Sequence, residues 1–152
     1  MVKIREKIIS SAIEIFTSMV MMDISVSEAE FDSKGKLENS ITGVIGLAGV
    51  QKGVLAIHVP YPVAFAITGN FLGIEIQEIN EDVEDAIGEI ANMLGGNVKS
   101  ILSENGKDIE LSLPSTISGA EYGFQPVKAA EEIFITFNSD KGNFVIELIL
   151  EQ

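Results

Sequence analysis

Residues 81–100, EDVEDAIGEIANMLGGNVKS, have the apolar spacing of an amphipathic helix. Each residue advances about 100° around a helix axis, and on that projection the apolar side chains gather within about 60° of Ile87. They are Val83, Ile90, Ala91, Leu94, Val98, Ile101 and Leu102. This stripe predicts a long helix near residues 81–104 that packs one face against a hydrophobic core.

The opposite side of the predicted helix carries four residues that we call the polar strip. They are Asp85, Glu89, Asn92 and Gly96, and their spacing of three and four residues places them within one arc about 60° wide. Acids and an amide are also what an ordinary solvated helix face shows. The spacing alone therefore leaves a functional and a purely structural interpretation open.

Three glycines inside this helix need an explanation, because each costs roughly 1 kcal/mol relative to alanine. Gly96 lies in the polar strip, where bare backbone beside Asn92 would let another molecule come close. Gly88 and Gly95 lie at the flank, where they could admit neighbouring elements of the same chain. The glycines therefore favour close contacts on two sides of the helix.

The composition is that of an acidic globular chain. Its 152 residues include 10 Lys and Arg against 23 Asp and Glu, and the net charge of -13 repels nucleic acid and anionic membranes. With no cysteine and one histidine, disulfides, thiolate metal sites and a serine triad are not expected. We expect a single domain, residues 1–152, in the reducing cytoplasm, with no nucleic-acid or membrane partner.

The remaining segments predict an α+β fold. Residues 1–22 and 61–73 have helical apolar spacing, and residues 119–130 are predicted to be irregular. Strands are predicted at residues 23–32, 39–48, 53–59 and 109–118, and in the closing hairpin EIFITFNSDKGNFVIELIL, residues 132–150. The expected architecture is an antiparallel sheet of about six strands packed with two long helices and one shorter helix.

A faint internal repeat relates the two long predicted helices. SAIEIFTSM in the first helix aligns with DAIGEIANM in the second, which sets Ile15 in the place of Glu89 and Ser18 in the place of Asn92. A pseudo-two-fold repeat of helix and strands is one interpretation of this match. Chance agreement between two amphipathic helices is the other.

The polar strip and its context resemble the CheX phosphatases of bacterial chemotaxis, within the larger CheC/CheX/FliY group. The D/S-x-x-x-E-x-x-N pattern of that family is matched by Asp85, Glu89 and Asn92, and it continues into MLGGNVKS. The segment LSLPSTISG, which contains Pro114, and the closing hairpin are also similar to the family. The resemblance covers most of the chain.

The resemblance implies an enzyme whose substrate is the phosphorylated aspartate of CheY, a small response-regulator receiver domain. It implies Glu89 and Asn92 as the catalytic pair, while Asp85 and Gly96 are expected to border the bound substrate. No cofactor of the chain's own is implied, because the Mg²⁺ ion belongs to the receiver. The resemblance also implies a homodimer, and the differences in the first helix imply one active site per chain.

Other interpretations stay open beside this one. The same helix face could belong to a non-catalytic adaptor that binds a receiver domain or a component of the flagellar switch. Asp85 and Glu89 could be ligands of a divalent ion, although two carboxylates are too few for an all-protein site. His58 could serve as a base, but its position at the end of an apolar strand, just before Pro60, favours a structural role.

Overall fold

The computed structural model describes residues 2–28, 36–103, 107–124 and 131–151. Within these ranges the helical elements are α1 (Val2–Ile15), the π-helical turn η1 (Phe16–Val20), α2 (Tyr61–Leu72) and α3 (Glu81–Leu102). The strands are β1 (Ser25–Val26), β2 (Lys36–Gly49), β3 (Gly53–Pro60), β4 (Ile109–Leu111), β5 (Ser115–Gly123), β6 (Glu131–Ser139) and β7 (Gly142–Leu150).

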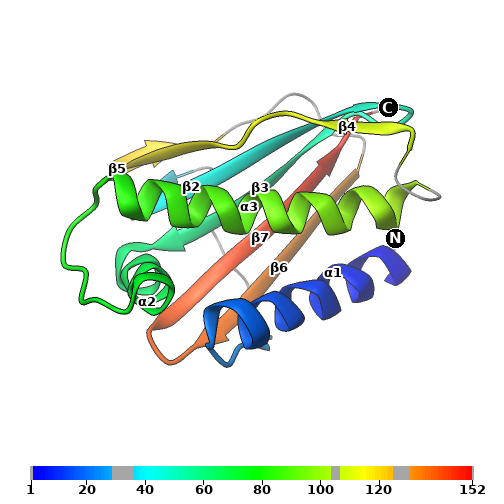
Figure 1. Cartoon of the computed structure of the whole chain (residues 1–152). Helices are drawn as coiled ribbons and strands as arrows, with labels where there is room; N and C mark the ends of the chain where they lie inside the picture. Colours follow the sequence, from blue (N-terminus) through cyan, green and yellow to red (C-terminus); the bar gives the residue numbers. More distant parts are fainter. Residues whose placement is uncertain (1, 29–35, 104–106, 125–130, 152) are drawn as a thin grey trace.

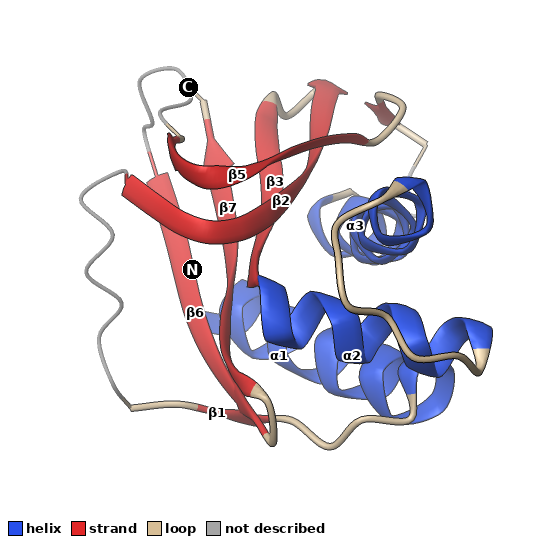
Figure 2. Cartoon of the chain, turned by 90° about the vertical axis from the view of Figure 1, so that its left-hand side faces the viewer, coloured by secondary structure: helices blue, strands red, loops and turns tan. Residues whose placement is uncertain are grey.

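One sheet and one layer of helices make up the fold (Figure 1). The strand order is β1-β6-β7-β3-β2-β4, β5 also pairs with β2, and every pairing is antiparallel. Figure 2 shows all three helices on the same face of this sheet. The predicted α+β class with an antiparallel sheet is therefore confirmed.

The sheet has seven described strands, one more than predicted, because the expected strand at 109–118 is two strands. They part at residues 112–114, where Pro114 cannot donate a hydrogen bond to the ladder. The first piece pairs with residues 47–49 and the second with residues 36–44. Residues 119–123, predicted to be irregular, belong to β5, whereas residues 125–130 lie outside the described part.

The early strand is shorter than predicted. From the segment 23–32 the structure forms only Ser25–Val26, which pairs with Phe137 and Asn138 of β6. Residues 29–35, which contain most of the predicted turn, lie outside the described residues. This short strand closes one edge of the described sheet.

The hydrophobic core fills the space between the helices and the sheet. Its fully buried side chains include Ile8 and Phe16 from the N-terminal helical elements, Ile41 and Ile45 from β2, and Phe144 from β7. Phe144 stacks on the ring of Phe16 with centroids 4.9 Å apart, so α1 and its π-helical turn are held on the sheet. No described helix is long and apolar enough to span a lipid bilayer.

Glycines on both sides of the contact seat α3 directly on β2. A Cβ atom at Gly43 would lie 3.1 Å from both the Cγ2 atom and the carbonyl oxygen of Ile87. A Cβ atom at Gly95 would lie 3.2 Å from Cδ1 of Ile45. Both distances are shorter than ordinary carbon contacts, so the glycines let helix and sheet approach closely. This explains the conformational penalty at Gly95.

The first turn of α3 is fixed by its cap. The Asn80 side chain accepts a hydrogen bond from the Val83 N–H at 3.1 Å, which satisfies one of the free donors of the first turn. Glu81, Asp82 and Glu84 lie in that turn, where carboxylates interact favourably with the helix dipole. The cap therefore fixes the start of the helix, and with it the positions of the polar-strip residues that follow.

Candidate functional site

The polar strip lies on the solvent side of α3. Asp85, Glu89, Asn92 and Gly96 are all exposed, whereas the apolar stripe from Val83 to Val98 is buried against the sheet and the other helices. Within the described part of the chain, no hydrogen bond or ion pair engages the side chains of Glu89 and Asn92. Both groups are therefore free to bind an external molecule.

Glu89 and Asn92 form a mixed pair of one anion and one neutral amide. They stand three residues apart, about 4.5 Å along the helix axis, and project from neighbouring positions of the same face. An ionised carboxylate only accepts hydrogen bonds, whereas the amide both donates and accepts. The pair can thus bind a cation with one member and orient a water molecule with the other.

The three glycines of α3 have different surroundings. Around Gly96 no heavy atom lies within 4 Å of where a Cβ would be, so the helix backbone is bare beside Asn92. A Cβ at Gly88 would make ordinary contact with Pro114, 3.8 Å from its Cβ atom. Gly95, as described above, packs against Ile45 of β2. Gly96 is thus the one of the three whose missing side chain leaves open space on the solvent side.

The charge around the polar strip is strongly negative. Glu81, Asp82 and Glu84 are exposed on the same helix as Asp85 and Glu89. This half of α3 therefore attracts a partner with a basic surface. Among the described residues, no group of three or more His, Cys, Asp or Glu side chains is arranged to hold a metal ion.

His58 is fully engaged inside the protein. It is 4% exposed, and its Nε2–H donates to Oε1 of Glu147 at 2.9 Å. Its Nδ1 atom lies 2.8 Å from the hydroxyl of Thr42, which in turn lies 2.8 Å from the hydroxyl of Tyr122. We call these four residues the buried quartet; Thr42, His58 and Glu147 are buried, and Tyr122 is half-buried. The ring of Phe124 covers His58 edge-on, so this imidazole has no access to an external substrate.

The buried quartet joins four neighbouring strands, β7, β3, β2 and β5. Sequence reasoning found only His58, because its partners are far away along the chain. One signal was available: Glu147 is the only charged residue in the apolar run FVIELIL of the last strand. A charge in such a run indicates a buried partner, since an unpaired buried carboxylate is strongly unfavourable.

The burial of α1 does not support the superposition predicted for the two long helices. That alignment places Ile15 on Glu89, yet Ile15 is buried and Glu89 is exposed. Burial matches at a shift of 75 residues instead, with Ile8, Ala12, Ile15 and Phe16 in the places of Val83, Ile87, Ile90 and Ala91.

At this shift Glu14 of α1 takes the place of Glu89, and Thr17 takes the place of Asn92. Both are exposed, but the amide is missing, and the helix passes into the π-helical turn η1 at Phe16. The Glu and Asn combination therefore occurs once on these two helices. The pseudo-two-fold repeat itself stays a prediction.

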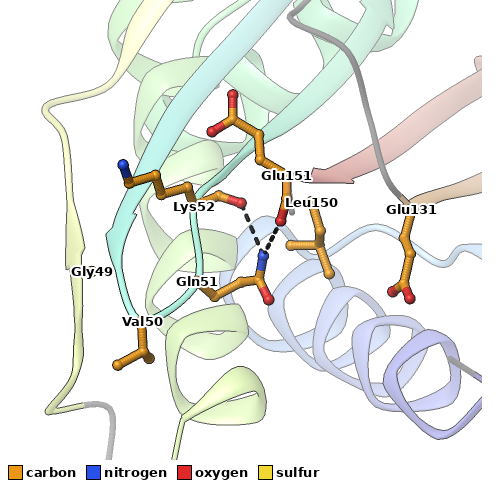
Figure 3. A pocket seen from close by; sticks show the side chains of 7 residues that line it. All are labelled: Gly49, Val50, Gln51, Lys52, Glu131, Leu150 and Glu151. Carbon is orange, nitrogen blue, oxygen red and sulfur yellow. Dashed lines mark hydrogen bonds between the residues drawn. The ribbon is translucent and has the colours of Figure 1, made fainter.

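A hollow of about 420 Å³ lies between the β2–β3 turn, Glu131 at the start of β6, and residues 150–151 at the end of β7 (Figure 3). The side-chain amide of Gln51 spans its wall and donates to the carbonyl oxygens of Lys52 and Glu151 at 3.1 and 2.8 Å. The hollow shares no residue with the polar strip. Its amide serves to join the turn to the last strand, so we do not assign it to the candidate site.

Comparison with known proteins places this chain among chemotaxis proteins. The curated protein CheY-P phosphatase CheX from Thermotoga maritima is 24% identical over 120 residues, which are 78% of this chain and 77% of that protein. The crystal structure of the chemotaxis protein CheX from Desulfovibrio desulfuricans is 26% identical, has a TM-score of 0.85 and covers 98% of this chain and 99% of its own.

The fold also occurs in a protein captured with its partner. A chain in the crystal structure of the CheX-CheY-BeF3-Mg²⁺ complex from Borrelia burgdorferi has a TM-score of 0.75 at 16% identity, with 97% of both chains covered. The family model for the chemotaxis phosphatase CheX matches residues 41–138, which include the whole polar strip. This chain therefore belongs to the CheX family of chemotaxis phosphatases.

Proposed function

We propose that this protein is a cytoplasmic phosphatase that hydrolyses the aspartyl phosphate of a CheY-like response regulator. The observation that carries the proposal is the exposed and unpartnered pair of Glu89 and Asn92 on one face of α3. The name of the Thermotoga maritima relative, CheY-P phosphatase, and the CheX–CheY complex from Borrelia burgdorferi support the choice of substrate.

Asn92 orients the nucleophile in this proposal. Hydrolysis of an acyl phosphate requires a water molecule in line with the phosphorus, and the P–O bond to the aspartate breaks as the new one forms. The products are inorganic phosphate and the free aspartate. The Asn92 amide accepts from the water and donates to an oxygen nearby, which fixes the direction of attack.

Glu89 fixes the position of the partner. It pairs with a lysine of the receiver through a charge-assisted hydrogen bond, while Asp85, one turn earlier, borders the docked surface. Mg²⁺ enters as part of the receiver and neutralises charge on the phosphoryl group, so this chain supplies no metal ligand. Gly96 leaves the helix backbone open, and α3 can approach the phosphorylated aspartate closely.

Receiver dephosphorylation tests the proposal directly. A CheY-like receiver from the same organism is phosphorylated with a small phosphodonor, and phosphate release is followed with and without the protein. We expect Asn92→Ala to lose the acceleration and Glu89→Ala to weaken it. Asn97→Ala and Glu84→Ala are matched controls, because they remove an exposed amide and an exposed carboxylate from the same helix. Equal loss in the controls would contradict the assignment.

A non-catalytic adaptor is the second candidate, because the same exposed acidic face can bind a receiver without turnover. Binding of a phosphorylated receiver that leaves its phosphate lifetime unchanged would favour this function.

The divalent-ion interpretation of Asp85 and Glu89 predicts tight Mg²⁺ or Ca²⁺ binding to the isolated protein in calorimetry. Sedimentation of the purified chain tests the homodimer, which stays a prediction.

A further inference from the structure

An exposed leucine stands beside the polar strip. The connection between β4 and β5 runs along one flank of α3 (Figure 1). The contacts of two helix glycines show that it is the flank of Gly88 and Gly95. A Cβ at Gly95 would lie 3.6 Å from Cδ1 of Leu111, and a Cβ at Gly88 would lie 3.8 Å from Pro114. Chain and helix therefore run antiparallel, and Leu113 falls between these two contacts, along the stretch of α3 that carries Glu89 and Asn92.

Leu113 is 87% exposed, the highest fraction among the exposed large hydrophobic side chains of the described residues. A single exposed leucine is ordinary on a protein surface, but this one is held in place. The Ser112 N–H donates to the Gly46 carbonyl at 3.0 Å, and the Gly46 N–H donates to the Ser112 hydroxyl oxygen at 2.9 Å. Pro114 restricts the backbone on the other side.

The position of Leu113 ties it to the phosphatase site. Any partner that brings a phosphoryl group to Asn92 must cover the adjacent flank of α3, where the contacts of Gly88 and Gly95 hold the β4–β5 connection. Protein interfaces combine a few well-packed apolar anchors with a surrounding polar rim. The polar strip supplies charge and hydrogen bonds, whereas Leu113 supplies the apolar contact that the strip itself lacks.

We propose that Leu113 is the apolar anchor with which this protein binds its phosphorylated receiver domain. The inference rests on the proposed function and extends it. It assigns part of the affinity for the receiver to a residue outside α3, the helix that carries Glu89 and Asn92. The receiver then presents an apolar patch close to its phosphorylation site and next to the lysine that pairs with Glu89. Leu113 contributes to binding and takes no part in the hydrolysis step.

The test separates binding from chemistry. We expect Leu113→Ala to raise KM for the phosphorylated receiver about tenfold and to leave kcat within about twofold, as for a contact made equally in ground and transition states. Val2→Ala is the matched control, because Val2 is 72% exposed and lies beside Ile133 and Phe134 of β6, in a surface hollow that includes no residue of the polar strip or of the β4–β5 connection. The control should change neither constant.

Titration with a receiver that carries BeF3⁻ and Mg²⁺ tests the anchor without turnover. Leu113→Ala should raise the Kd about tenfold, and Leu113→Asp should raise it further, whereas Asn92→Ala should change it little. An unchanged Kd and KM for both Leu113 variants, with the wild-type protein active, would overturn the anchor and leave the phosphatase proposal intact. A higher Kd in the Leu113 variants, with no turnover in the wild-type protein, would support the anchor and contradict the phosphatase proposal.

Discussion

The polar strip on α3 and the buried quartet in the sheet contain similar chemical groups in opposite situations. In the quartet, the carboxylate of Glu147 and the imidazole of His58 are buried and bonded to each other at 2.9 Å. In the polar strip, the carboxylate of Glu89 and the amide of Asn92 are exposed and have no described partner. The quartet's polar groups satisfy one another inside the fold, whereas Glu89 and Asn92 remain available to an external molecule, as the proposed function requires.

The largest effect is expected from removing the histidine of the quartet. His58→Ala leaves the buried carboxylate of Glu147 without its partner, and we expect the free energy of unfolding to fall by about 3 kcal/mol. Chemical denaturation measures this loss. Phosphatase activity of the folded fraction should stay normal. Loss of activity at full folding would contradict the division between the two regions.

Asn92→Ala should show the reverse behaviour. We expect dephosphorylation to slow by about 100-fold, which corresponds to about 2.7 kcal/mol of transition-state stabilisation, because the attacking water loses its orientation. The free energy of unfolding should change by less than about 0.5 kcal/mol, as for other exposed positions. Single-turnover phosphate release and denaturation are measured on the same sample. A large change in stability would mean that the amide has a structural partner.

Gly96→Ala sharpens the comparison inside the polar strip itself. No atom lies within 4 Å of the new methyl group, so we expect the helix to gain up to about 1 kcal/mol of stability. Activity should fall, since the methyl group occupies the space that the receiver approaches. Thermal unfolding and KM are the two readouts. A variant that gains stability and keeps its KM would remove Gly96 from the docking surface.

The phenol of the quartet gives a pH test. Burial raises the pKa of Tyr122 from 10.0 to about 12. The hydrogen bond with Thr42 lowers this pKa in part, and the nearby Tyr61 raises it a little further. Between these two values the unfolded chain has released the phenol proton and the folded chain retains it, so stability falls as the pH rises through this window. Solvent screening limits the loss to about 1 kcal/mol.

Denaturation at several pH values between 10 and 12 measures this loss. Tyr122→Phe should remove the part of the alkaline destabilisation that this phenol causes, while Tyr61→Phe should leave most of it. An equal alkaline slope in wild type and Tyr122→Phe would show that the quartet does not hold this proton.

The smallest effect is expected on α1. Thr17→Asn, introduced together with Asn92→Ala, places an amide three residues after Glu14, with the same spacing as Glu89 and Asn92. We expect no measurable recovery of activity, because Thr17 lies in the π-helical turn and α1 has no glycine equivalent to Gly96. Thr17→Asn alone is the control for folding. Recovery to a tenth of the wild-type rate would show that both helices can present the same site.

The helix with the polar strip was predictable because its information is local. One segment of about twenty residues contains both the apolar stripe from Val83 to Val98 and the exposed strip. The helical period of 3.6 residues places the two sets on opposite faces. The family pattern then selected Glu89 and Asn92 from an otherwise ordinary polar face. The same helical projection separated Gly96, in the strip, from Gly95, at the flank, and the structure agrees. The sequence did not show that Ile45 of β2 is the residue that packs on Gly95, because that depends on where β2 lies.

The quartet and Leu113 were not predictable, because they depend on strand register. Thr42 and Glu147 meet His58, and Tyr122 meets Thr42, only after β2, β3, β5 and β7 pair as they do, over separations of 16 to 89 residues. The division of residues 109–118 into two strands was missed for a related reason. Pro114 was visible in the sequence, but the break into two strands also required that residues 36–44 and 47–49 of β2 pair with separate strands.

The spacing of Glu89 and Asn92 comes from one continuous helix, so it does not rely on any tertiary contact. The height of that helix above the sheet, by contrast, is set from beneath by Gly43 and Gly95. A graft of residues 81–102 onto another scaffold would therefore transfer the geometry of the pair but not its elevation. In the proposed complex, substitutions at the buried Gly43 or Gly95 would change how deeply the pair enters the receiver, although the receiver touches neither residue.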